Sequence, residues 1–99
     1  MTEERIRKNE ERLDKSLESV RKLEEALEQF KACRKDLSLL DRYYGSKNWL
    51  KDKEDWEQKK IPQIKAGVLS EDAVWNLLEE VDELIHDMND VVRQYSKKK

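Results

Sequence analysis

The sequence of 99 residues contains few of the residues that interrupt a helix. It has two glycines and one proline. These residue types mark most turns, so their scarcity favours long, uninterrupted helices. The single cysteine, Cys33, excludes an internal disulfide and favours a reducing compartment.

Long hydrophobic runs are also missing. No stretch of about 18 apolar residues occurs, so the sequence predicts no transmembrane helix and no membrane association. The first 15 residues are charged throughout, unlike a signal peptide. We therefore expect a cytoplasmic protein.

Charged residues are abundant, at 44% of the chain, and they are unevenly distributed. Residues 1–44 carry 11 basic and 11 acidic side chains, whereas residues 67–96 carry 8 acidic and 1 basic, a net charge of −7. Residues 45–66 have a net charge of +2, and Lys97–Lys99 form a basic tail. The length suits one domain, residues 1–99, with a thin core.

A long helix is predicted over residues 3–44. Its apolar residues recur every three or four positions, which is typical of one helical face. Thr2 is the expected N-cap, and Gly45 is the expected left-handed residue after the last turn. The stripe comprises Ile6, Leu13, Leu17, Val20, Leu23, Leu27, Phe30, Cys33, Leu37, Leu40 and Tyr44.

Two further helices are predicted after this turn. Ser46 caps a short helix over residues 47–59, and Pro62 lies in a connector over residues 60–69. Ser70 caps a second long helix over residues 71–96, with Leu69 and Val74 as a hydrophobic staple. Its wide apolar stripe is Val74, Leu77, Leu78, Val81, Leu84, Ile85, Met88, Val91, Val92 and Tyr95.

These elements predict an all-α fold, an antiparallel hairpin of two long helices with a short helix between them. Packed from the Gly45 end, the second long helix would cover the first back to about Leu17 or Val20. The start of the first helix would then overhang. Its sparse apolar residues, Ile6 and Leu13, agree with poor burial and also suit one side of a dimer seam.

Two motifs carry a resemblance to a known family. They are Tyr43-Tyr44-Gly45-Ser46, followed by Trp49 and Asp52, and Gly67-Val68-Leu69-Ser70-Glu71-Asp72-Ala73-Val74, with Pro62 between them. From about Arg5 to Met88 the chain resembles domain of unknown function 4298. That resemblance implies a small, helical, cytosolic bacterial protein and no particular activity. Residues 57–61 differ from the family, which usually has a glycine before the apolar-proline pair, so the short helix is expected to end differently here.

Candidate catalytic and metal-binding residues have simpler explanations. His86 has Asp82 and Asp90 four residues to either side, but one helix supplies too few ligands in a poor arrangement, and a solvated polar face explains the pattern equally well. Cys33 lies on the apolar stripe with no base indicated nearby. The sequence therefore predicts no enzyme, metal, cofactor or small-molecule substrate.

The expected function is protein–protein interaction through helical surfaces, with another protein or a second copy as partner. The alternative is an acidic inhibitor of the phage or mobile-element type that mimics nucleic acid and blocks a basic site on a nucleic-acid-processing enzyme. Direct nucleic-acid binding is not expected, since acidic residues interleave with the lysines of residues 47–65. The candidate partner-binding residues are Asp72, Glu79, Glu83, Asp87, Asp90, Ile6 and Leu13.

Aromatic residues gather around the first turn. Packing the helices together explains them best, because aromatic side chains contribute much buried area to a thin core. A binding patch is the alternative, and an exposed tryptophan would mark it. The aromatic residues around the turn are Tyr43, Tyr44, Trp49 and Trp56. A site at this end would gather Tyr43, Trp49, Asp52, Trp56 and Trp75.

Overall fold

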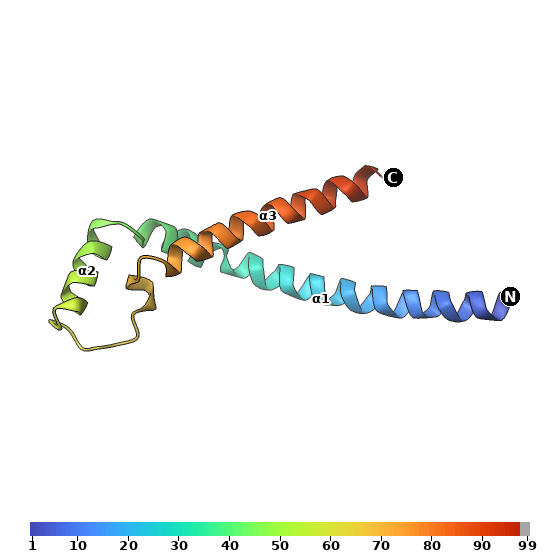
Figure 1. Ribbon diagram of the computed structural model, residues 1–99, viewed down its shortest axis with the longest axis horizontal. Helices are drawn as coiled ribbons and strands as arrows, with labels where there is room; N and C mark the ends of the chain where they lie inside the picture. Colours follow the sequence, from blue (N-terminus) through green and yellow to red (C-terminus); the bar gives the residue numbers. More distant parts are fainter. Residues whose placement is uncertain (98–99) are drawn as a thin grey trace. The chain divides into compact units, whose positions relative to one another are not determined.

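The computed structural model describes the backbone of residues 1–97 and the side chains of residues 1–96. Three α-helices follow one another: α1 (Thr2–Tyr43), α2 (Lys47–Glu57) and α3 (Ala73–Lys97), with a single 3₁₀ turn, η1 (Gly67–Leu69), before α3 (Figure 1). Residues 1–97 contain no strand, so the predicted all-α class and the order of two long helices around a short one are confirmed. Lys98 and Lys99 of the predicted tail lie outside the described residues.

The chain divides into two units, Met1–Lys35 and Asp36–Lys99. The first is a single helical segment of α1. The second contains the end of α1, α2, η1 and α3. The predicted antiparallel packing of the two long helices, with its overhang, stays a prediction.

Several predicted helix ends are confirmed by backbone and capping geometry. Gly45 has a φ of 76°, the left-handed conformation expected after α1. The Ser46 hydroxyl accepts a hydrogen bond from the Trp49 amide at 3.1 Å, which caps α2. The Ser70 hydroxyl likewise accepts from the Ala73 amide at 3.0 Å.

Other ends differ from the prediction. Thr2 lies inside α1, where its hydroxyl accepts from Arg5 Nη2 at 3.2 Å, and the Met1 carbonyl accepts the Arg5 amide at 3.1 Å. Thr2 is therefore not the N-cap. Residues 71–72 form a turn, so α3 starts two residues later than predicted.

α2 ends at Glu57, two residues earlier than predicted, in a Schellman motif. The Lys60 amide donates to the Asp55 carbonyl at 2.9 Å, and the Lys59 amide donates to the Trp56 carbonyl at 3.1 Å. Lys59 takes the left-handed position, with a φ of 57°. A lysine is strained there, because its Cβ crowds the backbone in a way that glycine avoids.

Lys59→Gly is therefore expected to raise the free energy of unfolding by about 1 kcal/mol, by relieving this strain. Gly45→Ala is the reciprocal control, expected to lower it by a similar amount, because no atom lies within 4 Å of an added Cβ and the backbone alone decides the effect. Urea denaturation followed by circular dichroism measures both changes. A destabilised Lys59→Gly variant would contradict this account.

The core lies in the Asp36–Lys99 unit. Among the described side chains the buried apolar residues are Trp49 of α2, Leu69 of η1 and Val74 of α3. The burial of Leu69 and Val74 agrees with the predicted hydrophobic staple. Within its own unit α1 has no buried residue, and the predicted coverage of its stripe by the second long helix stays a prediction.

Candidate functional site

Aromatic side chains from the end of α1 and from α2 donate hydrogen bonds to the backbone between α2 and α3. The Trp49 indole donates to the Val68 carbonyl at 3.0 Å, and the Trp56 indole donates to the Ile64 carbonyl at 3.2 Å. The Tyr44 hydroxyl donates to the Glu71 carbonyl at 2.6 Å. Each bond satisfies a backbone acceptor in the segment between α2 and α3.

Trp49 is the centre of this arrangement and is only 6% exposed. Its ring packs edge-on against Tyr44, with centroids 5.1 Å apart, and the Lys53 ammonium lies 5.2 Å from the Trp49 ring centroid. Lys53 also forms an ion pair with Glu71 at 3.0 Å. Trp49 is thus core, whereas Trp75, at 54% exposed, is not part of that core.

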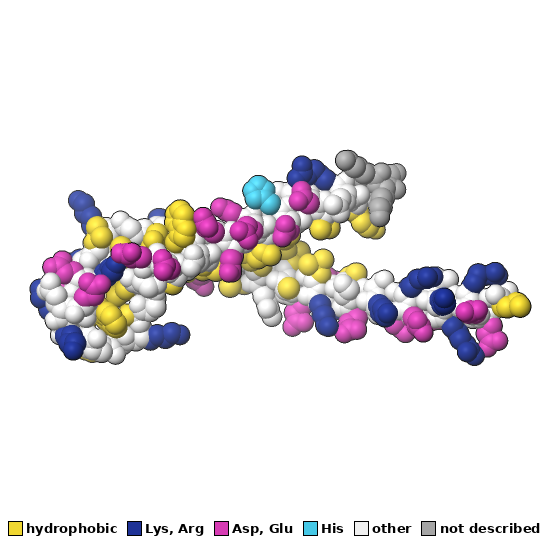
Figure 2. All heavy atoms as spheres, viewed as in Figure 1, with side chains coloured by type: hydrophobic (Ala, Val, Ile, Leu, Met, Phe, Trp, Pro, Cys, Tyr) yellow, Lys and Arg dark blue, Asp and Glu magenta, His cyan; other side chains and the backbone are white. Residues whose placement is uncertain are grey.

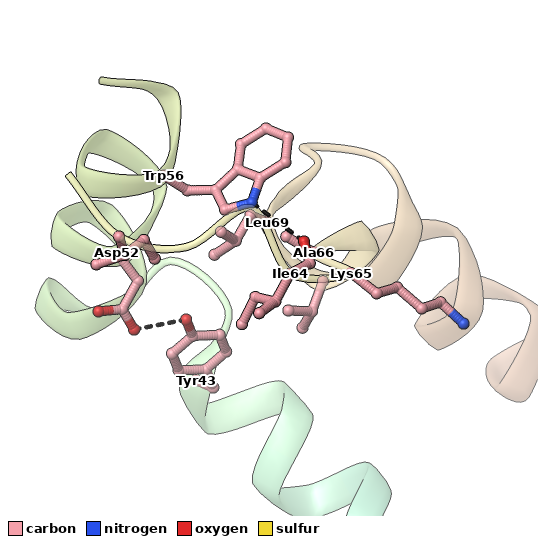
Figure 3. Close-up of a pocket in the computed structure, with 9 residues that line it drawn as sticks. Tyr43, Asp52, Trp56, Ile64, Lys65, Ala66 and Leu69 are labelled. Carbon is pink, nitrogen blue, oxygen red and sulfur yellow. Dashed lines mark hydrogen bonds between the residues drawn. The ribbon is translucent and has the colours of Figure 1, made fainter. Parts of the chain in front are cut away.

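A small pocket of about 170 Å³ opens beside this core (Figure 3). Its walls are largely apolar and come from α2, the connector and η1, with Trp56, Ile64 and Leu69 among the lining residues. Tyr43 and Asp52 supply its polar pair, since the tyrosine hydroxyl donates to Asp52 Oδ2 at 2.7 Å. The structure thus brings together Tyr43, Asp52 and Trp56 of the predicted aromatic cluster.

Burial raises the pKa of Tyr43 to about 12, and the hydrogen bond to Asp52 and its negative charge act in the same direction. Tyr43 therefore keeps its proton at neutral pH, the opposite of what a general base requires. The pair is suited to holding α2 against the end of α1.

The raised pKa predicts a loss of stability in alkali. The folded state retains the Tyr43 proton between the pKa of an exposed tyrosine, near 10, and its own pKa of about 12. Its contribution is complete below about pH 10 and disappears as the pH rises toward 12. Ultraviolet titration of tyrosinate should show one late-titrating group that is absent from Tyr43→Phe. An identical titration of the two proteins would contradict this.

The acidic candidate residues lie together on the surface of the second unit. Glu79, Glu83, Asp87 and Asp90 are all exposed on α3, and Asp72 is exposed in the turn before it. Asp90 Oδ1 accepts from Arg93 Nη2 at 2.7 Å. Figure 2 shows acidic side chains gathered along α3, close to the histidine.

Apolar side chains of α3 are exposed as well. They follow three columns with a repeat of seven residues. Val74, which begins one column, is buried, whereas further along the helix the exposed fractions rise to between 37% and 62% at Leu77, Leu84, Ile85, Met88, Val91 and Val92. Three apolar positions per seven is typical of a helix that packs in a bundle. The columns are Val74, Val81, Met88 and Tyr95; Leu77, Leu84 and Val91; and Leu78, Ile85 and Val92.

α1 has the same repeat. Ile6 and Leu13 begin a column that continues, seven residues at a time, through Val20 and Leu27. These four side chains are between 39% and 58% exposed. Ile6 and Leu13 thus belong to a longer apolar column. The seven-residue spacing of the sequence is enough to indicate it.

The sequence of this chain matches one known protein family. The model of the family described as domain of unknown function (DUF4298) matches residues 6–91. The chain belongs to the DUF4298 family. The match spans the α1 column, the aromatic core and most of α3 of this DUF4298 protein. No curated protein and no solved structure matches it.

Metal sites and membrane-spanning helices are absent from the described part of this DUF4298 chain. Within the described residues, no group of three histidine, cysteine, aspartate or glutamate side chains is placed to hold a metal ion. No helix in residues 1–97 is long and apolar enough to cross a membrane. The candidate surfaces are the α1 column, the α3 columns and the acidic side of α3.

Proposed function

We propose that this DUF4298 protein is a non-enzymatic interaction module that binds another protein through the apolar columns of its long helices. The observation that carries the proposal is the seven-residue repeat of exposed apolar side chains on α1 and α3. Fully burying an exposed apolar side chain is worth about 1.5–3 kcal/mol, so each of these half-exposed side chains would stabilise a complex by roughly half of that, and several lie in line on each helix.

The exposed Trp75 supports this function. It lies near the start of α3 and is 54% exposed, beside the column that begins at Leu78. Tryptophan is enriched among the residues that dominate binding energy at protein interfaces. We also propose a cytoplasmic location, because Cys33 is a free, exposed thiol.

The second candidate function is inhibition through the acidic side of α3. The observation that favours it is the charge of −7 over residues 67–96, together with the exposure of Glu79, Glu83 and Asp87. Such a surface complements a basic nucleic-acid groove, and its binding would weaken as salt screens the charges.

One assay separates the two functions. The immobilised chain is incubated with extract of its native cells, and retained proteins are compared between wild type, Leu84→Glu with Val91→Glu, and Glu79→Lys with Glu83→Lys. The proposal expects the first variant to lose the retained protein and the second to keep it, at low and high salt. The reverse pattern, with salt-sensitive retention, supports the inhibitor. Retention unchanged by either variant would contradict both.

A further inference from the structure

α1 carries the pattern of a coiled coil along most of its length. The column of Ile6, Leu13, Val20 and Leu27 is accompanied by a second column three residues further on. Alternating steps of three and four residues, kept in a strict repeat of seven, produce a left-handed supercoil with a partner helix. The second column is Asn9, Ser16, Leu23, Phe30 and Leu37.

The length of α1 favours a second copy as its partner. α1 has 42 residues and α3 has 25, or ~63 Å and ~38 Å at ~1.5 Å per residue. A helix the length of α3 falls short of α1 by more than four turns. Another α1 matches the whole column, including Ile6 and Leu13.

We propose that two copies of the chain associate through α1 as an antiparallel coiled coil, with its twofold axis between residues 21 and 22. This inference rests on the proposed function, names the partner of the α1 column, and replaces the predicted packing of α3 on the same stripe. The register is the one in which Val20 of one copy faces Leu23 of the other.

Residue types match across this register. Leu13 faces Phe30 of the second copy, and Ile6 faces Leu37. The polar members of the pattern face one another as well, since Asn9 lies opposite Arg34, which occupies the next position of the first column after Leu27. One mixed layer remains, in which Ser16 faces Leu27. Each layer occurs twice because of the twofold axis.

Charges beside the seam favour the same register. Glu10 of one copy lies next to Lys31 of the second, twice per dimer. Lys31 contacts its own Glu28 at 3.3 Å, an exposed ion pair of the kind that stabilises little and exchanges readily. Sliding the copies by one repeat, so that Leu13 faces Leu23, would place Glu10 beside Glu24, two like charges.

Competing self-pairings bring like charges or polar residues together. A parallel, in-register pair of α1 helices places Arg34 against Arg34 and Asn9 against Asn9 in the seam. Pairing α3 with itself in the antiparallel orientation brings Glu80, which flanks its columns, close to Asp87 of the second copy. The antiparallel α1 pair avoids both arrangements.

Cross-linking through the native cysteine tests the orientation. Cys33 is exposed, and in this register it lies beside Arg12 of the second copy, whereas the two Cys33 residues lie ~34 Å apart at ~1.5 Å per residue. The full chain with Arg12→Cys is treated with a short thiol-to-thiol cross-linker. Wild type and Lys22→Cys, on the outer face of the same repeat, are the controls.

Arg12→Cys should form covalent dimer about 100-fold faster than Lys22→Cys at ~10 µM chain, because pairing holds the thiols at an effective concentration near ~1 mM. Wild type should form almost none. Rapid cross-linking of wild type, equal rates in the two variants, or no dimer at all would each overturn the inference. If Arg12→Cys forms no dimer while the cell-extract assay still depends on the apolar columns, the second-copy inference fails and the proposed function stands.

Discussion

Trp49→Ala is expected to lower the free energy of unfolding by about 3–5 kcal/mol, the usual cost of removing a buried large aromatic side chain. A domain of this size has a total stability of about 5–15 kcal/mol. Trp49 is one of three buried apolar residues among the described side chains, so no large remaining core compensates for its loss. Much of the unit from Asp36 onward should unfold with it.

The size of this effect follows from the number of groups that depend on Trp49. Its indole satisfies the Val68 carbonyl, its ring packs against Tyr44, and the Lys53 ammonium lies over it. Truncation leaves a cavity and an unsatisfied carbonyl at the same place, and both are destabilising.

Urea denaturation followed by far-ultraviolet circular dichroism measures the change. Trp75→Ala is the matched control, because it removes the same side chain from a position that is 54% exposed and should alter the free energy by about 0.5 kcal/mol or less. Similar losses in the two variants would show that Trp49 is not the centre of the core.

The second large effect concerns association. Leu13→Glu combined with Val20→Glu is expected to abolish dimer formation, because it places charge in two neighbouring positions of the α1 column in each copy. The four side chains are about half exposed in the free chain, so each contributes roughly half of 1.5–3 kcal/mol, at least ~3 kcal/mol together, which raises the dissociation constant by about 100-fold or more.

The control adds the same charge to the outer face of the same helix. Gln29→Glu with Ala32→Glu introduces two carboxylates away from both columns and should leave the dimer intact. Helical content by circular dichroism verifies that α1 forms in both variants, and sedimentation velocity reports the association. A dimer that survives Leu13→Glu with Val20→Glu, or dissociates equally in the control, would contradict the seam.

Local chemistry made much of the fold predictable. Glycine at position 45 and serines at positions 46 and 70 determine their turns through backbone conformation and short-range hydrogen bonds, so their roles are confirmed. The end of α2 was harder to predict, because Lys59 takes a left-handed conformation that its residue type disfavours. The backbone amides of Lys59 and Lys60 donate to the Trp56 and Asp55 carbonyls, and these two hydrogen bonds hold Lys59 in that conformation.

The aromatic core and the pocket depend on contacts across the chain. The acceptors of Trp49 and Trp56 are backbone carbonyls 19 and 8 residues away, and no pattern of side chains marks a carbonyl. The exposure of the acidic residues on α3 was predictable from their spacing. The surface that covers the stripe of α1 could not be predicted, because an apolar face shows that a helix packs but not which surface it packs against.

The molar mass of the full wild-type chain, measured by sedimentation equilibrium over a range of concentrations, tests most directly whether the apolar column of α1 is an interaction surface between copies. The account predicts a mass that rises from 11.9 kDa toward twice that value as the concentration increases, and that stays at 11.9 kDa in the variant carrying Leu13→Glu and Val20→Glu. A wild-type mass of 11.9 kDa at every concentration would contradict it.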